Sequence, residues 1–345
     1  MKLGLQLGYW QAQPPGDALE KVLEAEKLGF DIVFTAESWG SDAFSPLAWY
    51  GASTTRIKLG TSIVQMSART PASTAMHALT MDHLSGGRLV LGLGLSGPQV
   101  VEGWYGQPFS NPLARTREYV GIVRQVLARQ APVTSPGPYF PLPYTGPGSM
   151  GLGKPLRPIT HPLRSDLPIF LGSEGPKNVA LTAEIADGWL PIYFSPRVGD
   201  MYRSWLAEGF ARPTARRTPG DFEIASNCSV VVTDERERVL ESMKPMLGFY
   251  IGGMGAKEVN FHKNVFARMG YEKEADQVQD LFLEGKRDEA IAAVPLDMVA
   301  DISLVGTAAQ IRDELAAWEE AGVTTLVVGA RSLDEMRGVA EVILG

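Results

Sequence analysis

The chain has little cysteine, little histidine and no excess of positive charge, and these shortages exclude several classes of protein. Its 345 residues contain one cysteine, Cys228, so an intrachain disulfide cannot form and a secreted disulfide scaffold is excluded. The 39 acidic residues outnumber the 32 basic ones, which gives a formal net charge of −7. Because nucleic-acid-binding proteins favour a basic face, we expect no nucleic-acid partner.

Long apolar runs are missing as well. No stretch approaches the roughly 18 consecutive apolar residues of a membrane-spanning helix, and the first residues lack the unbroken apolar run of a secretory signal peptide. The four histidines, His77, His83, His161 and His262, do not stand at the spacing of a zinc site. We therefore expect a cytoplasmic protein with no membrane partner and no metal.

A regular alternation of strand-like and helical segments is what the sequence does have. The strand-like apolar runs cover residues 2–8, 31–36, 57–64, 88–95, 168–171, 189–194, 222–232 and 325–328. Helical periodicity covers residues 17–28, 44–53, 71–84, 113–129, 178–186, 200–210, 308–321 and 333–344. Strands that alternate with helices pair in parallel, and eight of them close a barrel. The predicted fold class is therefore α/β, a (β/α)8 barrel.

Two stretches interrupt this alternation. Residues 132–168 hold ten of the 24 prolines and five glycines, which favours a long, ordered surface loop. Residues from about 245 to 305 are mainly helical and separate the seventh strand from the helix at 308–321. Neither stretch has the hydrophobic pattern of a core of its own, so we expect one domain spanning residues 1–345. Both insertions are expected to form walls of a substrate site.

The run Gly92-Leu93-Gly94-Leu95-Ser96-Gly97 matches the G-x-G-x-x-G pattern of dinucleotide-binding folds. That pattern requires a strand before the glycines and a phosphate-binding helix directly after them. The strand is present, but residues 98–103 are too broken for a helix of normal length, and no second strand ends in an acidic ribose ligand. The favoured interpretation is a barrel strand that runs into a wide loop, where small residues let a ligand approach the backbone.

Polar residues at several predicted strand ends indicate one site. The run Gly172-Ser173-Glu174-Gly175-Pro176-Lys177-Asn178 leads from a strand into a helix whose free amides suit an anion, although an ordinary turn explains it equally well. Glu37 ends the second strand, and Gln65, Ser67 and Arg69 follow the third. Because the carboxyl ends of barrel strands meet at the active-site mouth, we expect these side chains to gather there.

In their order along the chain, the motifs resemble those of the luciferase-like barrel superfamily. Within it they are similar to the deazaflavin-dependent (coenzyme F420) oxidoreductases of actinobacteria and archaea. The resemblance covers essentially the whole chain. It rests on the strand-two acid with Phe44-Ser45-Pro46-Leu47, Gly60-Thr61-Ser62-Ile63, Asp82-His83-Leu84-Ser85-Gly86-Gly87-Arg88-Leu89 before Leu91-Gly92-Leu93-Gly94, residues 168–175, Ala186-Asp187-Gly188-Trp189, Val305-Gly306-Thr307 and Ala321-Gly322-Val323.

The resemblance implies coenzyme F420 as the cofactor and a cis peptide bond between Ser62 and Ile63, behind the deazaflavin ring. It places Glu37 near the ring and its side chain, and Gln65 in a hydrogen bond to the ring. Two loops supply the remaining implied contacts. Ser96, Gly97 and Gln99 fall in the loop that touches the ribityl and phosphate part, and Gly172, Glu174, Gly175, Lys177 and Asn178 fall at the start of the phosphate-binding helix.

The chain departs from the family at the positions of two acid–base groups. Sugar-phosphate dehydrogenases of the family have a histidine after the strand-two acid and a glutamate in the strand-four loop. Here these places hold Ser38 and either Gly97 or Pro98. Glu37 and Glu102 are the carboxylates best placed by sequence for catalysis, and each equally suits the cofactor or a helix end. We expect a hydride to pass between the deazaflavin C5 and a small organic substrate, either an alcohol/carbonyl pair or an activated alkene.

Two alternatives stay open beside this prediction. The same superfamily contains FMN-dependent monooxygenases, in which an arginine often clamps the terminal phosphate; residues 96–106 here contain no arginine or lysine. The second alternative is a flavin- or deazaflavin-binding barrel without turnover, because the family's acid–base residues are missing. Family members pair through barrel helices, so we expect a homodimer or a higher homo-oligomer.

Overall fold

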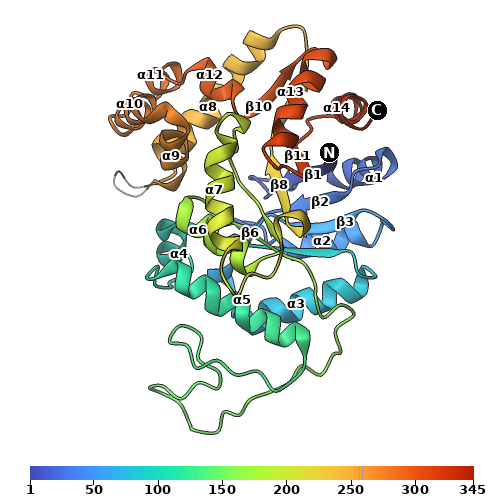
Figure 1. Cartoon of the computed structure of the whole chain (residues 1–345), viewed down its shortest axis with the longest axis vertical. Coiled ribbons are helices and arrows are strands. Elements are labelled where there is room, and N and C mark those ends of the chain that lie inside the picture. Colours follow the sequence, from blue (N-terminus) through green and yellow to red (C-terminus); the bar gives the residue numbers. More distant parts are fainter. Residues whose placement is uncertain (256, 258–259) are drawn as a thin grey trace.

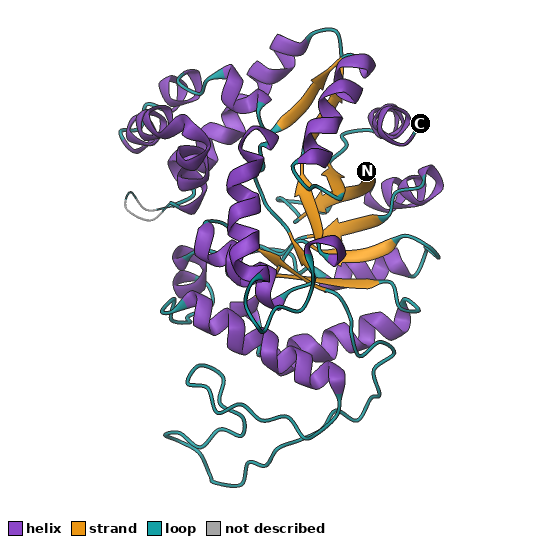
Figure 2. Cartoon of the chain, viewed as in Figure 1, coloured by secondary structure: helices purple, strands orange, loops and turns teal. Residues whose placement is uncertain are grey.

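The computed structural model describes residues 1–255, 257 and 260–345, and parallel strands surrounded by helices form its centre (Figures 1 and 2). The strands pair in the order β1–β2–β3–β5–β6–β7–β8–β11, and β11 pairs with β1, which closes the barrel. The predicted (β/α)8 barrel is confirmed. Its strands are β1 (Lys2–Gly8), β2 (Ile32–Thr35), β3 (Lys58–Thr61), β4 (Val64–Gln65), β5 (Leu89–Gly94), β6 (Ile169–Gly172), β7 (Gly188–Trp189), β8 (Glu223–Asn227) and β11 (Thr325–Val328).

Helices cover the outside of the barrel, and a further group lies beside it (Figure 1). The first seven are α1 (Ala18–Leu28), α2 (Phe44–Gly51), α3 (Pro71–Leu84), α4 (Pro98–Gly103), α5 (Pro112–Ala128), α6 (Pro176–Ile185) and α7 (Gly199–Phe210). The others are α8 (Arg236–Gly253), α9 (Phe261–Phe266), α10 (Glu272–Leu283), α11 (Arg287–Ala292), α12 (Leu296–Ala300), α13 (Ala308–Glu320) and α14 (Leu333–Leu344). Among the described residues, no helix has both the length and the apolar character needed to cross a bilayer.

Four predicted elements differ from the structure. The strand expected at 57–64 is interrupted at Ser62 and Ile63, which divides it into β3 and β4. The strand expected at 189–194 ends at Trp189, because Pro191 follows and cannot donate to a ladder. The strand expected at 222–232 is broken at Cys228 into β8 and β9 (Ser229–Val232). The second half leaves the barrel to pair with β10 (Ser303–Gly306), a strand that was not predicted. The helical stretch expected from about 245 begins earlier, since α8 runs through Pro245.

Side chains of alternating size fill the barrel interior. Phe34 on β2 occupies the space over Gly60, and Phe170 on β6 occupies the space over Gly188, so a methyl group at either glycine would collide with the ring. Large residues opposite small ones let a barrel of eight strands fill without voids. The interior cluster consists of Ile32, Phe34, Val90, Phe170, Leu190, Ala225 and Val327, with Ile63 packed against it.

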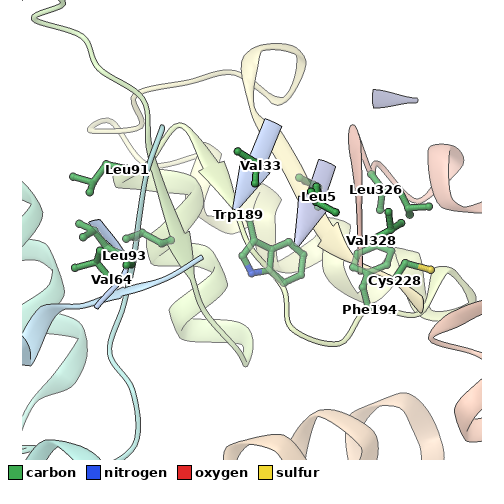
Figure 3. Packing of buried hydrophobic residues seen from close by; sticks show 14 of the residues in the cluster. Leu5, Val33, Val64, Leu91, Leu93, Trp189, Phe194, Cys228, Leu326 and Val328 are labelled. Atoms are coloured by element: carbon green, nitrogen blue, oxygen red, sulfur yellow. The ribbon is translucent and has the colours of Figure 1, made fainter. Parts of the chain in front are cut away.

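Outward-facing strand residues form the larger core between barrel and helices. Figure 3 shows members of this cluster, including Leu5, Val33 and Val328, around the indole of Trp189. The indole of Trp189 is buried and lies 6.0 Å from the ring of Phe194, and its N–H donates to the carbonyl of Ser173. Packing at this interface therefore fixes the turn that follows β6.

The Pro/Gly-rich loop does not line the mouth of the barrel, contrary to expectation. It connects the end of α5 to the start of β6, and such helix-to-strand connections lie at the amino-terminal end of a barrel, opposite the active-site end. Phe140 packs edge-on against Tyr119 of α5, and His83 bonds to the carbonyl of His161. The loop covers helices on the outside and projects from the body at the bottom of Figure 1.

Candidate active site

A bulge between β3 and β4 reaches into the mouth of the barrel. The peptide bond between Ser62 and Ile63 is cis, as the resemblance implies. The Ile63 side chain packs on the interior cluster and lies against the ends of β5 and β6. Methyl groups added to Gly94 and Gly172 would stand 2.7 and 2.9 Å from Ile63, so only glycine leaves this space free. We call Ile63, Gly94 and Gly172 the strand-end platform.

The strands beneath the platform approach each other closely. The hydroxyl of Thr61 donates to the carbonyl of Gly92 (2.8 Å) and accepts from its N–H (2.9 Å). A methyl group at Gly92 would overlap the carbonyl oxygen of Thr61. The glycines of the G-x-G-x-x-G match therefore serve close strand packing and open space at the mouth, in agreement with the interpretation that the sequence favoured.

Glu37 and Arg69 form an ion pair that holds the segment after the bulge. The guanidinium donates to both carboxylate oxygens, at 2.7 and 2.9 Å, and the two side chains are only 4% and 17% exposed. The N–H of Gln65 donates to the same carboxylate (2.9 Å), and the Gln65 amide donates to the carbonyl of Glu37 (3.1 Å). The structure thus brings Glu37 and Gln65 together, with both oxygens of Glu37 engaged.

Tyr105, which the sequence did not indicate, lies in the electrostatic field of this pair. Burial raises the pKa of its hydroxyl, and the negative charge of Glu37 raises it further, while Arg69 opposes them. Arg69 also stands over the ring of Phe44, 5.5 Å from its centre. An aromatic ring and a half-buried, neutral hydroxyl therefore lie near the ion pair at the mouth.

Several buried polar atoms at the strand ends have no hydrogen-bond partner within the described part of the chain. They are Gln6 Oε1 on β1, Gln65 Oε1 on β4, Ser67 Oγ just after it, and Glu174 Oε2 after β6. Buried polar groups in proteins are nearly always satisfied, and the exceptions call for a ligand, an ion or water. Their clustering at one end of the barrel is what a polar ligand site requires.

The loop after β5 contributes backbone more than side chains. Ser96 has a positive φ of 62°, and Gly97 precedes the short helix α4. The side-chain oxygen of Gln99 lies 3.1 Å from the position of a methyl group on Gly97. Glu102 is exposed on α4 and accepts a long bond (3.4 Å) from the N–H of Phe109. The structure gives no contact between Glu102 and Glu37, so these two carboxylates do not form a pair.

The start of α6 combines free amides with cationic side chains. Gly175 precedes the helix at a φ of 79°, Pro176 occupies its first turn, and Lys177 is exposed there. Arg268, from the segment after α9, places its guanidinium nitrogen 3.6 Å from the position of a methyl group on Gly175. Backbone amides and the helix dipole favour negative charge at such an end, and two cations strengthen that preference. Asn178 lies in the same turn.

Glu174 lies between the platform and α6 and is paired with His262 of α9. The imidazole Nδ1 stands 3.1 Å from Glu174 Oε1, and both side chains are about four-fifths buried. Tyr250 and Tyr193 approach the imidazole edge-on, at 5.1 and 6.2 Å between ring centres. Burial, with help from Tyr9, raises the pKa of Tyr250 to about 12, so its hydroxyl is neutral.

Sequence reasoning missed three of these residues for one reason. Arg268, His262 and Tyr250 come from the helical segment after β9, about 80 residues beyond Glu174 in the chain. Spacing along a sequence does not reveal which face of such a segment returns to the barrel. The available signal was composition, since four aromatic residues and His262 fall within residues 249–266.

The comparison with known families decides which proteins this barrel belongs with. A family model described as "Luciferase-like monooxygenase" matches residues 3–325. The chain belongs to the luciferase-like monooxygenase family. A Mycobacterium tuberculosis protein named "Putative coenzyme F420-dependent oxidoreductase Rv3520c" is 61% identical to this family member over 343 residues, 99% of each chain. The expectations of a luciferase-like enzyme and of a resemblance to F420-dependent oxidoreductases are both confirmed.

Solved structures show the same fold in luciferase-like barrels that are more distant in sequence. The coenzyme F420-dependent tetrahydromethanopterin reductase from Methanopyrus kandleri superposes with a TM-score of 0.79 at 23% identity, covering 99% of this chain and 98% of that one. An F420-dependent secondary alcohol dehydrogenase in complex with an F420-acetone adduct gives 0.74 at 19% identity, with the same coverage. At these identities the likeness concerns the fold.

Proposed function

We propose that this protein is an F420-dependent oxidoreductase that passes a hydride between C5 of the deazaflavin and a carbon of a small organic substrate. The observation that carries the proposal is the strand-end platform. Ile63 lies against two glycines at the strand ends, and Gln65, two residues further along the chain, has a side-chain oxygen without a partner among the described residues. A planar ring needs a flat, accessible surface with a polar group at its edge. The 61% identical relative, named as F420-dependent, supports the same cofactor.

The residues of the mouth fit the other parts of this cofactor as well. The start of α6, with Lys177 and Arg268, suits a phosphate, since amides and cations converge there. Backbone and polar side-chain atoms for the ribityl part of the cofactor come from Ser96, Gly97 and Gln99. When bound, the cofactor supplies the hydride acceptor or donor, and the protein supplies orientation, charge and exclusion of water.

Glu37 serves this site by positioning its neighbours. Both of its oxygens are engaged by Arg69 and the amide of Gln65, so it holds the segment after the bulge and aims the Gln65 side chain toward the ring. A carboxylate in a two-pronged bond with a guanidinium is a poor proton acceptor, because the arginine favours its charged form. We therefore rank a catalytic role for Glu37 below its positioning role. A catalytic role for Glu102 stays a prediction, and Glu102 has no partner at the mouth among the described residues.

The test is a fluorescence titration of the purified protein with oxidised F420 and, separately, with FMN. The proposal predicts saturable, tight quenching by F420 and weak binding of FMN, because the loop at residues 96–106 has no cation for a terminal phosphate. A preference for FMN would move the protein to the monooxygenase alternative. Binding of neither would contradict the assignment of the platform and of α6.

For the protein's partners, we propose a small-molecule substrate and a second copy of the chain. Trp49 on α2 and Met76 and Leu84 on α3 are each more than 60% exposed. The adjacent Pro/Gly-rich loop exposes Met150 and Ile159 even more fully. Several large, exposed apolar side chains on neighbouring elements favour an association surface, and closed pairs are the commonest assemblies. Sedimentation at micromolar concentration should give a dimer or larger; a monomer would contradict this.

A further inference from the structure

We propose that His262, oriented by Glu174, is the acid–base group that moves the substrate's hydroxyl proton, and that the substrate is an alcohol/carbonyl pair. This inference rests on the proposed F420-dependent function. His262 would take the role of acid–base groups that related dehydrogenases carry at two other positions. Here those positions hold Ser38 and either Gly97 or Pro98. Serine, glycine and proline have no side-chain group that exchanges a proton near neutral pH.

The fold places His262 at the mouth by fixing α9 to α8. Asn260 is buried at the start of α9, where its side-chain oxygen accepts from the N–H of Lys263 (2.9 Å). Its amide donates to the carbonyl of Ile251 near the end of α8 (2.7 Å). The rings of Phe109 and Phe261 also meet, 6.3 Å apart, and join α9 to the loop after β5. His262 is thereby held over the turn that follows β6.

The Glu174 carboxylate sets the proton positions on the imidazole. Glu174 Oε1 accepts the hydrogen at Nδ1 (3.1 Å), which leaves Nε2 as the proton-accepting nitrogen of the neutral ring. Nε2 makes no hydrogen bond to the described residues, and the side chain is 20% exposed. A carboxylate that fixes the tautomer of a histidine with a free second nitrogen is the arrangement that serves general base catalysis in other enzymes.

Three titratable side chains face His262 from the neighbouring elements. Glu174 comes from the β6–α6 turn, Tyr193 from the segment after β7 and Tyr250 from α8. Burial raises the pKa of Tyr193 and of Tyr250, so both hydroxyls stay neutral throughout the working range. On its own helix, the Lys263 ammonium is held by Asp276 at 2.6 Å.

The proposed step balances in atoms and electrons. The substrate's C–H bond breaks with both electrons and the hydrogen going to C5 of the bound deazaflavin, while its O–H proton goes to His262 Nε2. The C–O bond becomes a carbonyl, and the imidazolium then releases its proton to water. In the opposite direction, the charged imidazole donates to the carbonyl oxygen as the hydride arrives at carbon. Glu174 stabilises the charged ring in both directions.

The first measurement needs no substrate. The chain has four histidines, so the nitrogen-15 NMR spectrum of histidine-labelled protein is simple, and H262Q identifies the signal of His262. Near pH 8 we expect the Nδ1-protonated form in the wild type and a shift toward the Nε2-protonated form in E174Q. An Nε2-protonated ring in the wild type would overturn the proposed orientation.

The second measurement is turnover of oxidised F420 with 2-propanol, 2-butanol and cyclohexanol, followed anaerobically by the loss of F420 absorbance. H262Q should lower kcat about 10²- to 10⁴-fold and E174Q less, with the F420 Kd of H262Q within about twofold of the wild type. The rise of kcat with pH, which reports the imidazole, should vanish in H262Q. H161Q, which alters an exposed histidine in the Pro/Gly-rich loop, is the matched control and should change nothing.

The outcomes separate this inference from the function on which it rests. Failure to bind F420 would contradict the proposed function. Tight F420 binding without turnover of any of the three alcohols would overturn the alcohol/carbonyl assignment alone. A kcat and pH profile unchanged in H262Q would overturn the role of His262, while a loss of F420 binding in H262Q would show that the residue acts as a structural link.

Discussion

The two ends of the barrel use polar residues in opposite ways. At the amino-terminal end, Asp187 accepts from Arg124, from Arg217 and from the N–H of Ile169. Arg88 there donates to four backbone carbonyls and to the hydroxyl of Thr54. At the carboxyl-terminal end, four buried oxygens lack partners among the described residues. The polar groups at the amino-terminal end are mostly paired with one another, Arg124 Nε being an exception, whereas those at the carboxyl-terminal end leave four oxygens free for a ligand.

This difference separates the candidate site from a cavity at the other end of the barrel. A cavity of about 230 Å³ lies at the amino-terminal end, and Asp31, Lys58, Arg164, Asp187 and Arg217 are among its lining residues. Each of these charges already has an opposite charge within hydrogen-bond distance. A ligand that entered would compete with those pairs. Satisfied charges indicate stability, and unsatisfied polar atoms indicate binding.

Asp187→Asn should have the largest effect on stability. The substitution leaves the guanidinium of Arg124, 14% exposed, without its main counter-charge, and such losses cost about 3–5 kcal/mol. Urea unfolding measures the change. Asp200→Asn is the control, because this carboxylate also pairs with an arginine but is 97% exposed, and it should change stability by less than about 0.5 kcal/mol. F420 affinity should be unchanged in both, and a weakened affinity in Asp187→Asn would break the contrast between the two ends.

Glu184→Gln should show the pH dependence of the amino-terminal ion pairs. Hydrogen bonds from Arg117, Thr214 and Arg212 hold the pKa of the Glu184 carboxyl at about 2. Because this value lies below that of the unfolded chain, about 4.3, the carboxylate stabilises the fold fully above about pH 5 and progressively less as the pH falls toward 2. At pH 7 the variant should lose about 1–3 kcal/mol.

Urea unfolding at pH 7, 5 and 3.5 checks the direction in which the stabilisation by Glu184 changes with pH. The gap in unfolding free energy between the wild type and Glu184→Gln should be constant from pH 7 to 5 and narrower at pH 3.5. A gap that widens on acidification would mean that the pKa of Glu184 is raised on folding.

Gln65→Met should weaken F420 binding, because Gln65 lies at the carboxyl-terminal end of the barrel. The substitution keeps the size of the side chain and removes its free oxygen, so the F420 Kd should rise about tenfold, the worth of one hydrogen bond of about 1.4 kcal/mol. Gln279→Met is a matched control, since Gln279 is also buried with one bonded and one free polar atom but lies on α10. Equal F420 affinities for the two variants would remove Gln65 from the site.

Periodicity and strand-end chemistry predicted most of the fold from the sequence. Helices α3 and α14 have the predicted bounds, because Thr70 and Ser332 cap their first turns and Pro71 starts α3, signals that act within a few residues. The break at Cys228 was not predicted, since it depends on which strand the following residues join. β9 pairs with β10, some 70 residues away.

The candidate site also has one part that the sequence predicted and one part that it did not. Gln65 ends β4, and Glu174 and Gly175 come shortly after β6. The closure of a parallel barrel is enough to bring them to one mouth. The pairing of Glu37 with Arg69 and of Glu174 with His262 depends on side-chain direction and on how a helical segment folds back. No periodicity carries that information. Local rules therefore locate the mouth, and tertiary contacts decide which polar groups remain free.

The most direct test of this contrast is a crystal structure of the protein with oxidised F420. We expect the deazaflavin ring on the platform of Ile63, Gly94 and Gly172, with Gln65 Oε1 in a hydrogen bond to it and the phosphate at the start of α6. A cofactor bound in the amino-terminal cavity beside Arg88 and Arg217, or one that leaves the strand-end platform untouched, would contradict the assignment of the two ends.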